Sequence, residues 1–558
     1  MRLDFRQMPG TPSLLRDYIH AFDRLASFYV EDPRARGAWA RRAEAVDRRR
    51  YPREALAAAL RSRHTRWEAP GAALDRIAVL TDPRALVLIT GQQTGLFGGP
   101  LYTLYKALTV VRMAEQLAAD LARPVVAAFW LADEDHDVAE ADHVTLPDRA
   151  GNPVTIRHAR WGSPGYMPAN LQLGESISAE LQQVKELLPT SDFAPTALDA
   201  LAQAYRPERT LADAFAQWLL YLLGDTGLVL VDAADPQLKA LATPIFEREL
   251  AEAPTSSRRI LQATQALGAQ GYPAQIEARS DGVNCFLLQD GRHPLVRDEG
   301  GFRLRDTGTH VPREDALRMA RNEPERFSPN VALRPVVQDF LFPTLAYAAG
   351  PGELAYFAQL RGVYDAFDVS MPLIVPRASL TLVESRTGQL LDRFDLRLGD
   401  LTRDPEQLAS RVLRAQLPPD FDAALAKARA AVDDIFGEVG QVVAAVDSTL
   451  RATVGQTAGH VKGHLDQLQR KAVQALKRRE EETRKQVQRV REALMPGGRP
   501  QERIFPLLPY LAKYGRPVLS TIRQAIAGPG WDHLLLPLPS TAGKSSDDPG
   551  SGDRREQR

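Results

Sequence analysis

Four glycines within nine residues separate an apolar run from an amphipathic helix. The stretch reads ITGQQTGLFGGPLYTLYKALT over residues 89–109, and its glycines are Gly91, Gly95, Gly98 and Gly99. Glycine suits tight turns and the close approach of a ligand to the main chain. At a helix N-terminus, free N–H groups and the helix dipole also attract an anion. We therefore predict that the loop binds a phosphate or a carboxylate, with further polar contacts from Gln92, Gln93, Tyr102 and Lys106.

This glycine loop matches neither Gly-x-Gly-x-x-Gly nor the Gly-Lys-Ser/Thr ending of a P-loop. The prediction of an anion site therefore depends on geometry alone. Lys106 lies nearly two turns into the helix, so it either reaches the site or contributes surface charge. The competing interpretation of the loop is a purely structural turn.

Five ionisable residues, Asp133-Glu134-Asp135-His136-Asp137, follow directly after the apolar run PVVAAFWLA at 124–132. Carboxylates so close together repel one another unless something cationic balances them. An amine substrate, a Mg²⁺ ion or buried arginines would each do so, and a histidine can take up a proton near neutral pH. We predict catalytic roles for Asp133, Asp135 and His136. The alternative is a solvated, charged turn.

A third polar set is scattered through the apolar segment FSPNVALRPVVQDFLFPTLAYAAGPGELAYFAQL at 327–360. Polar groups buried among apolar residues need hydrogen-bond partners. They form either a hydrogen-bonded core network or the wall of a pocket with a few convergent polar groups. The candidate binding residues are Asn330, Arg334, Gln338, Glu353 and Tyr356, together with Arg377 in the later run MPLIVPRASLTL.

The apolar runs on either side of the glycine loop predict the strands that position the first two sets. Residues 84–90 (RALVLIT) and 124–132 are short and continuously apolar, as in strands buried on both faces. A helix from about Pro100 joins them, so the three elements form a βαβ unit with parallel strands. The carboxyl ends of parallel strands lie side by side, at the edge where open α/β sheets bind ligands. The glycine loop and the acidic string should therefore meet there, and a further strand is expected at 227–232.

Composition narrows the class of protein. The 558 residues include 70 Lys and Arg and 70 Asp and Glu, so overall charge favours neither nucleic acid nor an acidic membrane as a partner. No apolar run reaches the roughly 20 residues of a membrane helix. The N-terminus shows no secretory pattern, so the cytoplasm is the expected compartment. Cys285 is the single cysteine, which excludes an internal disulfide, and its apolar neighbours predict a buried strand.

Changes in composition and in the spacing of apolar residues divide the chain into five parts. Helices are expected at 1–80, an α/β core at 81–395 with insertions at about 150–225 and 240–330, and a helical coiled coil at 396–499. Residues 500–539 are apolar enough to return to the core, and the polar tail at 540–558 is expected to be disordered. Aliphatic residues at three-four spacing predict the coiled coil, but Gly455, Gly459 and Gly463 argue against one unbroken helix. The seam joins either two helices of one chain or two chains.

Three of these stretches together resemble one known family. GQQTGLFGGPLYTLYKA, FWLADEDHD and SPNVALRPVVQDFLFPTLAYAAGPGELAYFAQL, with MPLIVPRASLTLVE after them, are similar to the BshC family of bacterial bacillithiol biosynthesis. The similarity runs from about residue 84 to QERIFPLLPYLAKYG near the C-terminus. The resemblance implies a Rossmann-like core with inserted connecting segments and a coiled-coil domain that pairs two subunits as a homodimer. It implies no settled set of catalytic residues.

The reaction that the resemblance implies joins the carboxyl group of L-cysteine to the amine of glucosaminyl-malate. Amide formation from a free carboxylate needs activation, so ATP with Mg²⁺ is expected, although no nucleotide motif is present. The glycine loop would hold an anion, Asp133, Asp135 and His136 would serve the amine or Mg²⁺, and Arg334 would pair with the malyl carboxylate. Two alternatives remain: a nucleotide- or sugar-binding transferase of another pathway, and a coiled-coil scaffold protein.

Overall fold

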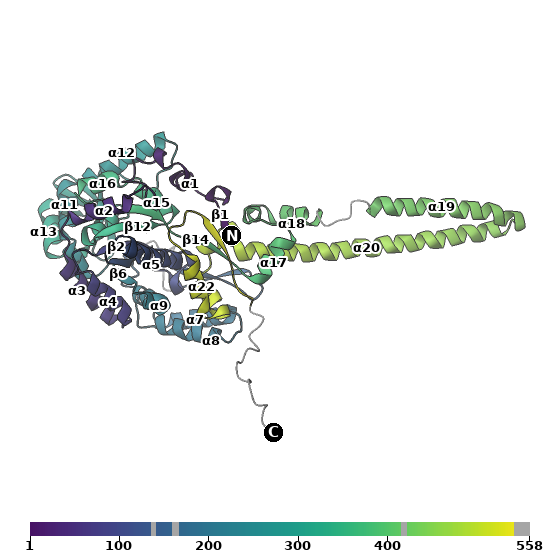
Figure 1. The fold of residues 1–558 in the computed structure, drawn as a ribbon, viewed down its shortest axis with the longest axis horizontal. Helices are drawn as coiled ribbons and strands as arrows, with labels where there is room; N and C mark the ends of the chain where they lie inside the picture. The colour runs from purple at the N-terminus through teal and green to yellow at the C-terminus, as the bar shows by residue number, and fades with distance from the viewer. Residues whose placement is uncertain (135–140, 159–166, 415–420, 541–558) are drawn as a thin grey trace, which may run out of the picture. The chain divides into compact units, whose positions relative to one another are not determined.

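The computed structural model describes residues 1–134, 141–158, 167–414 and 421–540. The predicted catalytic residues Asp135 and His136 and nearly all of the predicted tail lie outside these ranges. The chain divides into two compact units (Figure 1): one comprises residues 1–385 and the segment from Arg499 onward, and the other comprises Arg386–Gly498. No helix within the described ranges is both long and apolar enough to cross a membrane.

A five-stranded parallel sheet forms the centre of the first unit. Its strand order is β13-β12-β2-β3-β6, and neighbouring strands pair in parallel. The strands are β13 (Leu373–Pro376), β12 (Thr344–Ala349), β2 (Leu86–Gln93), β3 (Val125–Ala132) and β6 (Val229–Asp232). Nearly every residue in them is buried, which explains their continuously apolar sequences. The predicted Rossmann-like parallel sheet is confirmed.

Helix α5 (Leu101–Asp120) connects β2 to β3 and packs against both strands. The N-terminal helices α1 (Ser13–His20), α2 (Ala38–Asp47), α3 (Arg53–Arg66) and α4 (Gly71–Val79) are anchored to the same sheet. The buried Tyr18 hydroxyl donates to the carbonyl of Ile374 in β13 at 2.5 Å. The Arg42 guanidinium donates to the carbonyl of Thr344 in β12 at 2.8 Å.

Two segments are inserted between the strands of the central sheet. The first contains the hairpin β4 (His143–Pro147) and β5 (Pro153–Arg157) and helices α7 (Ser176–Leu187), α8 (Ala194–Ala204) and α9 (Leu211–Leu223). The second begins with helices α10 (Pro236–Leu241), α11 (Thr243–Glu252) and α12 (Thr255–Ala269). The first insertion and the start of the second are therefore mainly helical.

The second insertion continues into an antiparallel sheet, of which the sequence predicted only the buried strand around Cys285. Its order is β10-β9-β8-β7-β11. Cys285 is buried in β7, as predicted. The strands are β7 (Gly282–Leu288), β8 (Arg292–Asp298), β9 (Gly301–Leu304), β10 (His310–Pro312) and β11 (Phe327–Pro329), with α13 (Arg313–Asn322) before the last strand.

The segment from Arg499 onward belongs to the first unit. Its strand β15 (His533–Pro537) pairs in parallel with β14 (Ser379–Val383) and antiparallel with β1 (Arg2–Leu3). Before β15 come the short turn η8 (Gln501–Arg503) and helices α21 (Leu508–Tyr514) and α22 (Pro517–Ala525). This small sheet ties the C-terminal segment to the chain that leaves β13.

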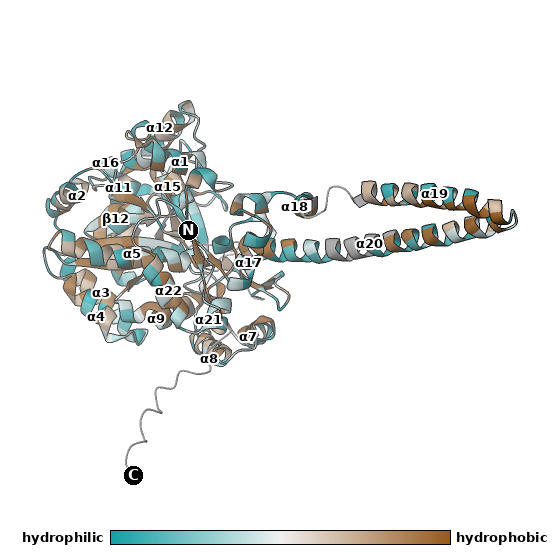
Figure 2. Cartoon of the chain, turned by 45° about the vertical axis from the view of Figure 1, so that its right-hand side comes forward, coloured by the Kyte–Doolittle hydropathy of each residue, from teal (hydrophilic) through white to brown (hydrophobic). Residues whose placement is uncertain are grey.

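The second unit is helical and contains the coiled-coil pair. Helix α19 (Phe421–Val446) lies alongside the N-terminal part of the longer helix α20 (Leu450–Leu494). The segment is not one unbroken helix, as predicted, but the break lies at 447–449 and not at Gly455, Gly459 and Gly463, which lie inside α20. The seam joins two helices of the same chain. Figure 2 shows apolar residues in α19 up to its turn into α20, and Ile435, Val439, Val442 and Val446 of this helix are exposed.

Candidate active site

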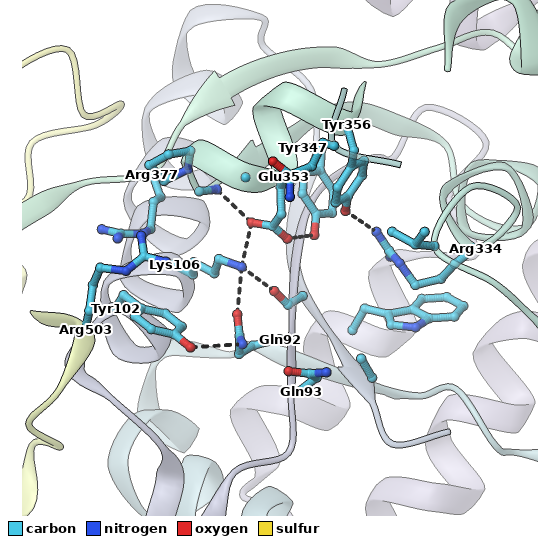
Figure 3. Close-up of a pocket in the computed structure, with 18 residues that line it drawn as sticks. Gln92, Gln93, Tyr102, Lys106, Arg334, Tyr347, Glu353, Tyr356, Arg377 and Arg503 are labelled. Carbon is cyan, nitrogen blue, oxygen red and sulfur yellow. Dashed lines mark hydrogen bonds and ion pairs between the residues drawn. The ribbon is translucent and has the colours of Figure 1, made fainter. Parts of the chain in front are cut away.

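A pocket of about 460 Å³ lies at the carboxyl edge of the central sheet (Figure 3). Four strands deliver residues to it: β2 through its last three residues, β3 through Trp130 and Ala132, β12 through the following turn, and β13 through Arg377 directly after it. Helix α5, helices α14 (Arg334–Leu341) and α15 (Pro351–Phe357), Arg503 of η8 and the loop residues Gln275 and Val331 also line it. This is the edge at which the sequence predicted a ligand.

A buried ion pair occupies the middle of the pocket wall. The Lys106 ammonium donates to the carbonyl of Gly91 at 2.8 Å and to Oε1 of Gln92 at 2.9 Å, and it lies 2.6 Å from Oε2 of Glu353. All three ammonium hydrogens therefore have acceptors within the protein. Burial lowers the pKa of Lys106, and Glu353 opposes that shift. Lys106 reaches the site, where it fixes the end of β2 to the start of α15.

Glu353 is held as tightly as its lysine partner. Its Oε1 accepts from the Tyr347 hydroxyl at 2.5 Å, and its Oε2 accepts from the Gly350 amide at 2.7 Å. The Gly350-Pro351-Gly352-Glu353 turn thus begins α15 with its own acidic side chain folded back over the helix start. The carboxylate faces the pocket in an orientation that several donors determine.

Arg334, unlike Lys106, donates its hydrogen bonds to neutral side chains. It lines the pocket at the start of α14, donates to Oε1 of Gln338 at 3.0 Å and to the Tyr356 hydroxyl at 3.1 Å, and stacks near Trp130 and Tyr347. These partners are neutral, and no carboxylate of the described residues forms an ion pair with it. Burial alone would lower the pKa of Arg334, but Tyr356, Tyr347 and Glu353 raise it. A permanently charged guanidinium in such a wall is suited to an incoming carboxylate or phosphate.

Arg377, by contrast, is already paired. Its guanidinium donates to both carboxylate oxygens of Glu502, at 3.1 and 2.8 Å. Glu502 also accepts from the Ser379 hydroxyl at 2.9 Å. Burial would raise the pKa of Glu502, but Arg377 brings it below its usual value. The same network contains His533, whose pKa burial lowers to about 4, so this imidazole is neutral at physiological pH.

The glycine loop turns away from the pocket after Gln93. Gly98 has φ +89°, and a Cβ on it would lie 2.5 Å from Cδ1 of Trp218. Its amide donates to the Tyr205 hydroxyl at 2.8 Å. The amides of Gly95 and Gly99 donate to carbonyls within the loop. Gly91, Gln92, Gln93 and Tyr102 line the pocket, whereas Gly95, Gly98 and Gly99 do not. These three glycines form a structural turn that fits against α9, and their amides present no cradle for a phosphate.

The first acidic residues lie at the predicted edge, but their side chains do not line the pocket. Asp133 is fully buried, and its carboxyl oxygens accept from no N–H or hydroxyl group of the described residues. Burial and then the neighbouring Asp232 raise its pKa well above the usual value, while Arg63, paired with Asp232, opposes the shift. Glu134 forms a buried ion pair with Lys239 at 2.5 Å. Arg63 and Lys239 are thus the cations that balance these carboxylates.

Two predicted binding residues support the site from behind. Asn330 donates to Asn284 at 2.8 Å, and its side-chain oxygen accepts from the amides of Ala332 and Leu333. Gln338 is buried between Arg334 and Asp339. Neither lines the pocket. The segment 327–360 is therefore both a core network and a pocket wall, because Arg334, Glu353 and Tyr356 face the cavity.

Several residues at the pocket could not be predicted from the sequence. Trp130 and Tyr347 belong to continuously apolar strands, where nothing in the sequence marks one face. Arg503 and its neighbour Glu502 stand about 125 residues beyond Arg377, beyond the helical unit, and only the fold brings them to the pocket. The apolar character of QERIFPLLPYLAKYG predicts only that this segment returns to the core, and nothing in it marks Arg503 as a pocket residue.

The described residues do not offer an evident metal or triphosphate site. No cluster of three or more His, Cys, Asp or Glu side chains suited to a metal occurs within the described ranges. The first amide of α5, from Leu101, donates to the carbonyl of Phe505, so the helix start is also occupied. The glycine loop therefore does not fit the predicted nucleotide phosphates.

Comparison with known proteins agrees with this architecture. Residues 1–378 match the N-terminal Rossmann-like domain, and residues 380–538 the C-terminal coiled-coil domain, described for bacillithiol biosynthesis BshC. A protein of Salinibacter ruber named "Putative cysteine ligase BshC" is 39% identical, covering 92% of this chain and 94% of its own length. Proteins with the same name from Koribacter versatilis and Chlorobaculum tepidum are 33% and 32% identical, covering 95% and 92% of this chain and 98% and 94% of their own lengths. The chain therefore belongs to the BshC family.

Proposed function

We propose that this protein is a cysteine ligase that acts in the last step of bacillithiol biosynthesis. It would form the amide bond between the carboxyl group of L-cysteine and the amine of glucosaminyl-malate. The observation that carries the proposal is the half-buried Arg334 guanidinium, which lines the pocket without a carboxylate partner among the described residues. The family membership supplies the reaction class.

Each wall of the pocket has a part in this reaction. Arg334 would bind a carboxylate of the malyl group through charge-assisted hydrogen bonds. Glu353 is the carboxylate of the pocket lining, and it would attract the ammonium group of the glucosamine ring before that group loses its proton. Lys106, Tyr347 and Gly350 hold Glu353 in place. Tyr356, whose pKa burial raises to about 12, stays protonated and keeps Arg334 oriented.

Activation of the cysteine carboxyl group remains part of the proposal. ATP with Mg²⁺ would supply that activation, as amide formation from a free carboxylate requires. We assign no residue of the glycine loop to the nucleotide, because the amides of Gly95, Gly98 and Gly99 are already bonded. Cytoplasmic location and pairing of two chains through the coiled coil also remain predictions.

Reconstitution tests the function directly. The purified full-length protein is incubated with glucosaminyl-malate, L-cysteine, ATP and Mg²⁺, and bacillithiol is measured by mass spectrometry. We expect product that requires every component. Arg334→Gln should raise KM for glucosaminyl-malate about tenfold or more, since a charge-assisted hydrogen bond contributes about 1.5–3 kcal/mol, whereas Arg334→Lys should lose less. Absence of product with the wild-type protein would favour a transferase of another pathway or a scaffold.

A further inference from the structure

The side chains that line the pocket carry more positive than negative charge. Four cationic side chains line it: Lys106, Arg334, Arg377 and Arg503. Lys106 is paired with Glu353 at 2.6 Å, and Arg377 is paired with Glu502 at 2.8 Å. The two other cations form no ion pair with any carboxylate in the described part of the chain. Arg334 and Arg503 are therefore available to pair with anionic groups of a ligand.

The two unbalanced arginines lie on opposite sides of the pocket. Figure 3 shows Arg334 on one side and Arg503 on the other, with the Lys106–Glu353 pair between them. Arg334 is held by α14 in the inner wall, whereas the Arg503 side chain is exposed at the mouth. Because the Lys106–Glu353 pair lies between them, we expect each arginine to meet a different anionic group.

The backbone turn that carries Arg503 is held firmly in place, although Arg503 itself is exposed. The two residues before it in η8 are buried and bonded to β14. The Gln501 amide accepts from the Leu382 N–H at 2.8 Å and donates to the Leu382 carbonyl at 3.0 Å. Glu502 accepts from the Leu380 N–H at 3.0 Å in addition to binding Arg377. The turn that carries Arg503 is thus fastened to the strand that follows Arg377.

We propose that Arg503 binds the anionic group of the cysteine-derived substrate, across the pocket from the malyl carboxylate at Arg334. This inference rests on the proposed ligase function. A substrate held by Arg334 through its malyl group would extend past Glu353, which attracts its amine, toward Arg503. The anion at Arg503 is either the free carboxylate of cysteine or the group added to that carboxylate on activation. In both cases the reacting carboxyl carbon is brought to the side of the amine that faces the mouth.

Steady-state kinetics of the full-length protein test the assignment. Arg503→Gln should raise KM for L-cysteine about tenfold, the effect of losing one charge-assisted hydrogen bond, and leave KM for glucosaminyl-malate unchanged. Arg503→Lys should retain part of the affinity. Arg499→Gln is the matched control, because Arg499 is an exposed arginine four residues earlier and does not line the pocket. Added salt should raise KM for L-cysteine in the wild type more than in Arg503→Gln.

Isothermal titration calorimetry with L-cysteine and no nucleotide separates the two sources of the anion. Weaker binding to Arg503→Gln would identify the free carboxylate; unchanged binding together with a raised KM in the full reaction would identify the activated group. The inference is overturned if KM for L-cysteine is unchanged in Arg503→Gln, or if only KM for glucosaminyl-malate rises. If the wild type makes no product, the proposed function fails, and the calorimetry alone then decides whether Arg503 binds the carboxylate.

Discussion

Replacing Asp133 by asparagine should stabilise the protein increasingly as pH rises and leave its chemistry intact. Asp133 is fully buried beside Asp232, and burial followed by the charge of Asp232 raises its pKa well above 3.8. The folded protein therefore keeps a proton that the unfolded chain releases once pH exceeds about 4. An asparagine has the same shape, needs no proton and can donate an N–H to Asp232.

The magnitude follows from linkage. Between the ordinary pKa of Asp133 and its raised value, the folded state binds one proton more than the unfolded state. The free energy of unfolding of the wild type then falls by about 1.4 kcal/mol per pH unit because of this group. The asparagine variant lacks that loss, so its advantage should grow by about 2.7 kcal/mol between pH 5 and pH 7, as long as the raised pKa lies above that range.

Paired thermal unfolding curves across this pH range measure the effect, with product formation as the second readout. Asp148→Asn is the control. Burial alone would raise the pKa of Asp148, but amide donors from Asn152 and Ala150 together bring it below its usual value, so the stability that this carboxylate contributes is lost only below about pH 4. The Tm difference between Asp148→Asn and the wild type should therefore be constant between pH 5 and pH 7. A Tm difference for Asp133→Asn that is constant with pH would refute the retained proton. Loss of product formation with an unchanged fold would instead establish Asp133 as catalytic.

Three further predictions concern the pocket wall, the glycine loop and the coiled coil. Lys106→Met should destabilise the protein by about 3 kcal/mol, because Glu353 is left charged and largely buried; adding Glu353→Gln should restore much of the Tm in the double variant. Gly98→Ala should cost about 1–3 kcal/mol through its contact with Trp218 and its positive φ, whereas Gly268→Ala, with open space around it in α12, should be neutral or slightly stabilising in the same thermal assay. Light scattering should give twice the chain mass for the full protein, and lysines in place of the exposed apolar residues of α19 should halve it; an unchanged mass would place the pairing surface elsewhere.

The central sheet could be predicted because its strands carry a strong signal. Continuous apolar runs at 84–90 and 124–132 and the helix between them define a βαβ unit, and the observed strands are Leu86–Gln93 and Val125–Ala132. In the antiparallel sheet of the second insertion, only the strand around Cys285 gave such a signal. Strand β8 is mostly half-exposed and contains Arg292, Arg297 and Asp298, so its sequence resembles a loop, and β9 has only four residues.

The density of glycines at 91–99 does not by itself say which group approaches the backbone. Their density does mark a close approach to the backbone, yet at Gly98 the approaching group is the indole of Trp218 and not a ligand. Trp218 lies 120 residues away in α9, so no local reading of the loop separates the two causes. The structural turn that the sequence left as an alternative describes Gly95, Gly98 and Gly99.

The direction of the side chains at the end of β3 explains why the ligand-binding edge of the sheet could be predicted from the sequence although the residues that line the pocket there could not. Trp130 and Ala132 line the pocket, so the alternation of a strand directs Leu131 and Asp133 to the other face. Leu131 is in register with Asp232 of β6, which places Asp232 on the same face as Asp133. An amphipathic strand would have revealed this parity in its sequence. A strand buried on both faces does not, because either face is apolar, and the charged residues that follow it can therefore be assigned to the correct edge and still to the wrong side of the sheet.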